Sequence, residues 1–153
     1  MGRMMNSVAP LTMTLWAGLV LGGSLIAAPA KFQAPSLELP VALEVGRAQF
    51  LWVGYAEAAC CGAMVALLVV SALRGELQRL ALILALSAML LLAVQRLALM
   101  PLLNERTDAI IAGSIVPPSQ LHLVFIILEI LRLAILIGAS WNATQKEPSH
   151  VTL

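Results

Sequence analysis

Charged side chains are scarce in this sequence. Asp, Glu, Lys and Arg make up 11% of the 153 residues, whereas about 25% is usual for a soluble domain. Hydrophobic residues make up 61%, and a soluble domain of this size buries only about 70% of its chain surface. The excess of apolar side chains therefore excludes a soluble enzyme and a disordered tail. It indicates a polytopic integral membrane protein whose surrounding partner is the lipid bilayer.

A strong charge of one sign is also lacking. The formal net charge is +1, so no basic field exists to attract nucleic acid, and we expect no nucleic-acid partner. Recognised catalytic motifs are absent as well, since the sequence contains no HExxH, GxSxG, P-loop or GxGxxG. The chain therefore carries no motif that names a reaction.

Metal ligands and paired cysteines are few. The two cysteines, Cys60 and Cys61, are adjacent in an apolar run, and neighbours on a helix point about 100° apart, which is unsuitable for a disulfide. Of the two histidines, His122 lies in an apolar run and His150 in a polar tail. We therefore expect neither a disulfide framework nor a metal or cofactor site.

Four long apolar segments are present instead, at residues 8–30, 48–73, 80–103 and 119–141. Each exceeds the roughly 20 residues that cross a hydrocarbon core of about 30 Å. Because a segment in lipid must satisfy its backbone hydrogen bonds internally, these segments are expected to be helices. The sequence predicts an all-α four-helix transmembrane bundle, with residues 1–153 forming a single integral membrane domain.

Three connections separate these predicted helices, at residues 31–47, 74–79 and 104–118. Gly75 is the expected breaker in the short turn, and Ser119 is a suitable N-cap for the fourth helix. Arg3, Arg74, Arg79 and Lys146 fall on one side of the predicted topology, and Lys31, Arg47 and Arg106 on the other. Positive charge favours the cytoplasmic side, so both termini are expected in the cytoplasm.

Ionisable side chains inside the predicted spans are the sharpest functional signal. They are Glu57, Arg96, His122, Glu129 and Arg132. Four unpaired charges would cost on the order of 10 kcal/mol to insert, so we expect Glu57, Arg96, Glu129 and Arg132 to converge inside the bundle. Such a cluster is either an ion-pair network that stabilises the bundle or a site for a ligand, proton or substrate.

Small residues recur every four positions on two predicted helices. Thr14, Gly18 and Gly22 form one such stripe, and Gly54, Ala58 and Gly62 form the other. Stripes of this kind let helix backbones approach closely in lipid. We expect them to pack within the chain, and a homo-oligomer interface is the alternative.

A repeated spacing links the two halves of the chain. Pro29 precedes Glu57 by 28 residues, and Pro101 precedes Glu129 by the same interval. Parallel two-helix repeats occur in transport folds. Two matched landmarks leave both a repeat and a chance spacing open.

Residues 15–57 carry a family resemblance. The pattern has Trp-x-Gly in the first helix, Pro-x-Lys-Phe at its end, a Leu-Pro-Val-Ala-Leu loop, Val-Gly-Arg, and then Phe and a buried Glu. The matching positions are Trp16, Gly18, Pro29, Lys31, Phe32, Gly46, Arg47, Phe50 and Glu57. The sequence resembles a family of small bacterial inner-membrane proteins with four predicted helices. This resemblance implies a topology and a bacterial inner membrane, and it implies no activity.

A second resemblance is looser. Pro101, Asn104 and Arg106 resemble a stretch in small four-helix proteins of the anthrone-oxygenase-like group. In that group the Asn stands two residues after the Pro, so the different spacing here does not carry over oxygenase activity.

Three functions are compatible with these features. The first, which we expect, is a non-enzymatic accessory or scaffold protein with an intramembrane charge cluster. The second is an oligomeric transporter of a small solute or one coupled to protons, which would require self-association because four helices are few. The third is a membrane enzyme acting on a lipophilic substrate, with Glu57 or His122 as general base.

Overall fold

The computed structural model describes the backbone of residues 2–145 and the side chains of residues 8–145. Over the described range the chain is helical and contains no strand. Four helices are long and apolar enough to cross a membrane: Val8–Gln33, Leu39–Leu73, Arg79–Ile111 and Leu121–Thr144. The predicted all-α architecture, with four helices that could span a membrane, is therefore confirmed.

Two of the four spans are composed of several helical segments. The first consists of α1 (Gly2–Leu19), the π-helix η1 (Val20–Ala27), α2 (Ala28–Ala30) and the 3-10 turn η2 (Lys31–Gln33). The third consists of α4 (Arg79–Val94), the π-helix η3 (Gln95–Leu99) and α5 (Met100–Ile111). The second and fourth are the single helices α3 (Leu39–Leu73) and α6 (Leu121–Thr144).

The predicted helix bounds were wrong at several ends. Helix α3 begins at Leu39 and not at residue 48, because Pro40 lies in its first turn, where a missing N–H is tolerated. Helix α5 runs to Ile111 and not to residue 103, so the polar residues 104–108 are helical and not part of a loop. The salt bridge between Arg47 and Asp108, at 2.5 Å, holds this extension against α3.

The last helix also differs slightly from the prediction. It runs from Leu121 to Thr144, whereas residues 119–141 were expected, and so it includes the first residues of the polar tail. Ser119 Oγ accepts a hydrogen bond from the Leu121 amide at 3.2 Å, although Gln120 occupies the N-cap position. Residues 146–153 of the predicted tail lie outside the described residues. Gly75, the predicted breaker, has a φ of 69° just after α3 ends.

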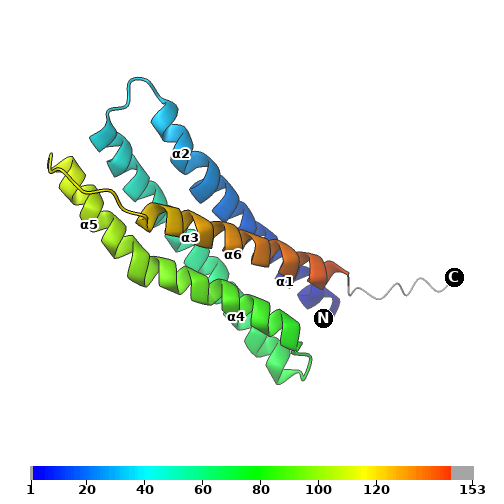
Figure 1. The fold of residues 1–153 in the computed structure, drawn as a ribbon. Coiled ribbons are helices and arrows are strands. Elements are labelled where there is room, and N and C mark those ends of the chain that lie inside the picture. The colour runs from blue at the N-terminus through cyan, green and yellow to red at the C-terminus, as the bar shows by residue number, and fades with distance from the viewer. Residues whose placement is uncertain (1, 146–153) are drawn as a thin grey trace.

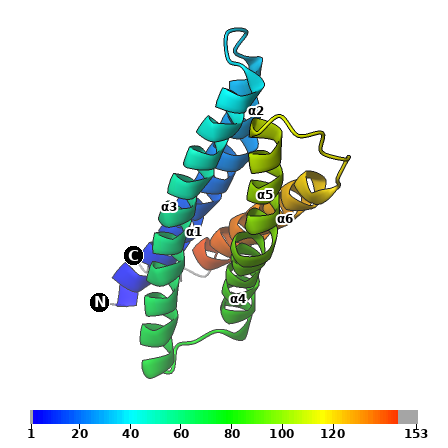
Figure 2. The same ribbon diagram turned by 90° about the vertical axis from the view of Figure 1, so that its left-hand side faces the viewer.

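Consecutive spans run in opposite directions, and α6 is tilted across the others (Figures 1 and 2). The start of α1, the α3–α4 turn and the end of α6 lie toward one end of the bundle (Figure 1). Side chains bind α1 to α6 near this end: Thr14 Oγ1 and Ser140 Oγ are 2.8 Å apart, and the Ser140 hydroxyl donates to the Pro10 carbonyl. The residue 34–38 loop and the residue 112–120 loop lie toward the other end (Figures 1 and 2).

The two π-helices occupy equivalent places in the two halves. Each ends two residues before a proline, Pro29 after η1 and Pro101 after η3. A proline has no N–H, and its ring crowds the carbonyl four residues earlier, so α-helical pairing cannot continue through it. A shift to wider i→i+5 pairing accommodates the proline without ending the span. The two π-helices add a structural match to the two landmarks in the sequence, which left both a repeat and a chance spacing open.

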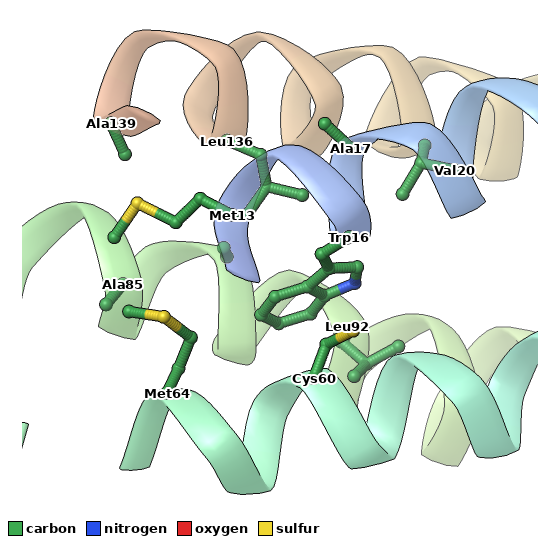
Figure 3. Packing of buried hydrophobic residues seen from close by; sticks show 11 residues of the cluster. Met13, Trp16, Ala17, Val20, Cys60, Met64, Ala85, Leu92, Leu136 and Ala139 are labelled. Atoms are coloured by element: carbon green, nitrogen blue, oxygen red, sulfur yellow. The ribbon is translucent and has the colours of Figure 1, made fainter. Parts of the chain in front are cut away.

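Apolar side chains from all four spans form the core (Figure 3). Trp16 is its largest member and is fully buried beside Cys60 and Leu92. Cys60 and Cys61 are both free, as their adjacency predicted. Many large aliphatic side chains point outward on every span, which is the surface that a lipid environment requires.

In the predicted stripe of the first span, Thr14 contacts Ser140 of α6, whereas Gly18 of α1 and Gly22 of η1 do not pack within the chain, contrary to our expectation. Gly18 and Gly22 are exposed, and a Cβ added to either would meet nothing within 4 Å. Gly62 on α3 is open in the same way, and Ala58 is exposed. Close approaches occur at Gly23, where an added Cβ would meet Val53, and at one member of the predicted α3 stripe, Gly54, where it would meet Arg96. A four-residue spacing alone does not tell which face of a helix the neighbours occupy, because every face of a helix recurs at about that interval.

Candidate functional site

Glu57, at the middle of α3, is the centre of a buried cluster of charged side chains. Arg132 Nη2 donates to its Oε1 at 2.6 Å, and Arg96 Nη2 donates to its Oε2 at 2.8 Å. The Trp16 indole donates to Oε1 at 3.4 Å. Three other spans therefore direct a donor at one carboxylate of α3.

Glu129 joins the cluster through Arg132, one turn along α6. Arg132 Nη2 donates to Glu129 Oε1 at 2.8 Å, so one nitrogen serves both carboxylates. Gln95 donates from its amide nitrogen to Glu129 Oε1 and to the Phe125 carbonyl, both at 3.2 Å. We call Glu57, Arg96, Glu129 and Arg132, with Trp16 and Gln95, the charge network.

The backbone of η3 and a glycine of α3 position Arg96. Gln95 and Arg96 are consecutive in the π-helix, yet Gln95 contacts α6 and Arg96 contacts α3. Arg96 also donates to the Phe50 carbonyl at 2.8 Å. It lies against Gly54, where a Cβ would stand 2.6 Å from its Cζ. A side chain at this position would therefore require the guanidinium to shift.

The charge network is almost wholly enclosed by protein. Glu57, Gln95 and Arg132 have no exposed surface, Glu129 is 1% exposed, and the Arg96 side chain is 21% exposed. Two carboxylates and two guanidiniums cancel in formal charge. Because buried charges are tolerated when they are paired and hydrogen-bonded, this pairing removes much of the cost of placing them in a membrane.

Several buried polar atoms have no hydrogen-bond partner among the described residues. They are Ser24 Oγ, Arg47 Nε, Gln95 Oε1, Glu129 Oε2, and Nε and Nη1 of Arg132. Buried polar groups are normally paired with protein or with bound molecules. These atoms are therefore free to form hydrogen bonds with a bound molecule.

A cavity of about 290 Å³ adjoins the charge network on the side of the two longer loops. Segments of all four spans enclose it, and Glu129, Ser24, Lys31, Phe50 and His122 are among the residues that line it. His122 is exposed and forms none of the ion pairs, although it is one of the five ionisable residues singled out from the sequence. It faces the same cavity as Glu129 without belonging to the network.

The structure thus brings together four of the five ionisable residues singled out from the sequence. Sequence reasoning did not assign Trp16, Gln95, Ser24 or Lys31 to the site. Gln95 stood beside Arg96 as a second polar residue in an apolar run, which was a usable signal. Trp16 and Ser24 gave none, because their roles depend on which face of the first span meets α3 and α6.

Metal-binding groups are not gathered in the described part of the chain, where no three His, Cys, Asp or Glu side chains are placed to hold an ion. Comparison with protein-family models, with curated proteins and with solved structures gives no match to this chain. The resemblance to small bacterial four-helix inner-membrane proteins therefore stays a prediction that rests on the motif residues alone.

Proposed function

We propose that the protein is a non-enzymatic accessory or scaffold protein of a membrane, with a bundle stabilised by the charge network. The observation that carries this proposal is the engagement of Glu57. Both of its carboxylate oxygens accept hydrogen bonds, from Trp16, Arg96 and Arg132. A general base needs a free acceptor within reach of the proton that it removes. The geometry therefore supports a structural carboxylate at this position.

His122, the alternative general base, also lacks the hydrogen-bond partner that usually orients a catalytic histidine. A catalytic histidine is commonly oriented by a second group that binds its other ring nitrogen. His122 is exposed, and its ring makes no hydrogen bond with the described residues. This favours the accessory role over the enzymatic one.

The same proposal specifies which membrane holds the protein and how the protein is oriented in it. The motif resemblance favours a bacterial inner membrane. The excess of Lys and Arg at the start of the chain, in the 74–79 turn and after α6 favours a cytoplasmic location for that end of the bundle. Both termini would then be cytoplasmic.

A homo-oligomer is the second candidate, and the outward stripe on α1 favours it. Gly18 of α1 and Gly22 of η1 leave the backbone of the first span uncovered on the outer surface. A second copy would approach closely there, as small-xxx-small faces do in lipid. The oligomeric transporter would be built on this interface.

Native mass spectrometry of complexes released directly from membranes tests both proposals. An accessory protein is expected with a different protein bound in a fixed ratio. A homo-oligomer is expected as a multiple of the chain mass that Gly18→Leu and Gly22→Leu abolish. Ile83→Phe, at an exposed position of α4, should leave it intact. Release of the bare monomer alone contradicts both.

A further inference from the structure

The cavity beside the charge network has the size of a small ligand site. Its volume is about 290 Å³, at the lower end of the roughly 300–1,000 Å³ typical of ligand pockets. It extends along α6 from His122 to Glu129. Seven residues of helix correspond to about 10 Å. One end is therefore near the longer loops and the other is beside the charge network.

The inner end of the cavity accepts hydrogen bonds. Glu129 Oε1 is occupied by Arg132 and Gln95, whereas its Oε2 is buried and has no partner among the described residues. Ser24 is 7% exposed, and its Oγ is equally unpartnered. A carboxylate oxygen can only accept. An occupant that presents an O–H or N–H donor at this end would therefore complete the hydrogen bonding of the ionised Glu129 carboxylate.

The outer end carries positive charge. Arg47 lines it and is paired with Asp108 at 2.5 Å, which offsets its charge. Lys31 also lines it, and no carboxylate of the described residues lies within ion-pair distance of its Nζ. Lys31 packs over Gly46, where any Cβ would clash with Nζ, and lies 5.6 Å from the Phe50 ring centroid. An uncompensated ammonium held in this way favours an anion at the outer end and disfavours a cation.

The walls between these ends are mainly apolar. Phe50 and Phe125 meet edge to face with ring centroids 5.5 Å apart, and Ala28, Leu43 and Ile126 also line the cavity. Such walls suit a hydrocarbon chain or an aromatic ring.

We propose that this cavity binds a small lipophilic acid that carries a hydroxyl group at the end opposite its acidic group. The anionic group lies at Lys31, the hydrocarbon part lies along the apolar walls, and the hydroxyl donates to Glu129 Oε2 next to Ser24. This goes beyond the accessory role and does not depend on it. It also gives the charge network a second task, because Arg132 and Gln95 fix the Glu129 carboxylate in the orientation that receives the ligand.

Equilibrium dialysis of the protein in phosphatidylcholine nanodiscs tests the proposal, with protein-free nanodiscs as the blank. Three probes of equal chain length separate the contributions: ω-hydroxydecanoate, decanoate and ω-hydroxydecylamine. Protein-dependent binding is expected to be tightest for ω-hydroxydecanoate. Decanoate lacks the donor and should bind about tenfold more weakly, as expected for one hydrogen bond to a charged group. The amine should bind most weakly.

Two variants assign these preferences to residues. Lys31→Met should abolish the preference for the acid over the amine, whereas Arg79→Met, which removes a basic residue at the opposite end of the bundle, should preserve it. Ser24→Ala should reduce the advantage of the hydroxylated acid several-fold, whereas Ser87→Ala on α4 should not. Thermal unfolding of each variant checks that it is folded.

Equal protein-dependent binding of the three probes to the wild-type chain, or none above the blank, would overturn the proposal without any variant. An unchanged acid preference in folded Lys31→Met would overturn it as well. Neither result bears on the accessory role, because that role is judged by the bound protein partner.

Discussion

Arg132 Nη2 lies 2.6 Å from Glu57 Oε1, and neither side chain has any exposed surface. The two residues come from α6 and α3, and the same nitrogen also reaches Glu129. Breaking a buried pair leaves an unpaired charge inside the protein, which is more damaging than removing both partners. The stability of the bundle therefore depends on the balance between buried positive and negative charges more than on any single residue.

Removal of one charge from the network should therefore destabilise the protein strongly. Glu129→Leu and Arg132→Leu are each expected to lower the free energy of unfolding by about 3–5 kcal/mol. The double variant leaves the Glu57–Arg96 pair balanced and should recover much of this loss. Denaturant unfolding in detergent measures all three proteins.

The exposed pair of Arg47 and Asp108 is the matched control for this cycle. Their side chains are 38% and 65% exposed, so a break in this pair is expected to cost no more than about 1 kcal/mol. Additive losses in the Glu129/Arg132 double variant would contradict the pairing argument.

Gly54 should tolerate no side chain. A Cβ there would stand 2.6 Å from Arg96 Cζ, and Arg96 is held in place by hydrogen bonds to Phe50 and Glu57. Gly54→Ala is expected to displace the guanidinium and to lower stability by about 1–3 kcal/mol, the usual range for overpacking. Thermal unfolding in detergent provides the measurement.

Gly18→Ala is the control for Gly54→Ala, because a Cβ at Gly18 meets nothing within 4 Å. It should be neutral or slightly stabilising, since alanine is the better helix former by about 1 kcal/mol. Equal effects at the two positions would mean that Arg96 does not lie against Gly54.

Trp16 should contribute both packing and a hydrogen bond. Trp16→Phe keeps most of the buried ring and removes the indole donor to Glu57, so a loss of about 0.5–1.5 kcal/mol is expected. Trp16→Ala also leaves a cavity and should cost about 3–5 kcal/mol. If the two variants were equally stable in thermal unfolding, the buried position of Trp16 would be wrong.

The orientation in the membrane can be read with reporter fusions. A fusion at Glu76, in the α3–α4 turn, is expected to report the cytoplasm, and a fusion at Ile115, in the loop before α6, the opposite side. The predicted loop was residues 104–118, but residues 104–111 are helical. The fusion is therefore placed at Ile115, in the part that is a loop. The reverse pattern would invert the proposed topology.

The number and type of the spans were predictable from the sequence because they depend on local composition. A run of about 20 apolar residues must be helical in lipid whatever surrounds it. The ends were less predictable: α3 and α5 extend into polar sequence, where a helix is kept by contacts such as Arg47 with Asp108. A charge inside a span likewise predicted burial in protein, and Glu57, Glu129 and Arg132 are buried.

The sequence by itself determined that four apolar helices form and that their internal charges balance, because hydrophobicity, length and charge are properties of each segment alone. Only the tertiary structure decided that Glu57 is the shared partner of Arg96 and Arg132, that Gly54 and not Gly18 lies at a contact, and that a cavity lies beside Glu129. These features depend on how each helix is rotated about its axis. The π-helices at residues 20–27 and 95–99 change that rotation. Each wider turn rotates the residues after it away from the positions that they would have in a regular 3.6-residue helix.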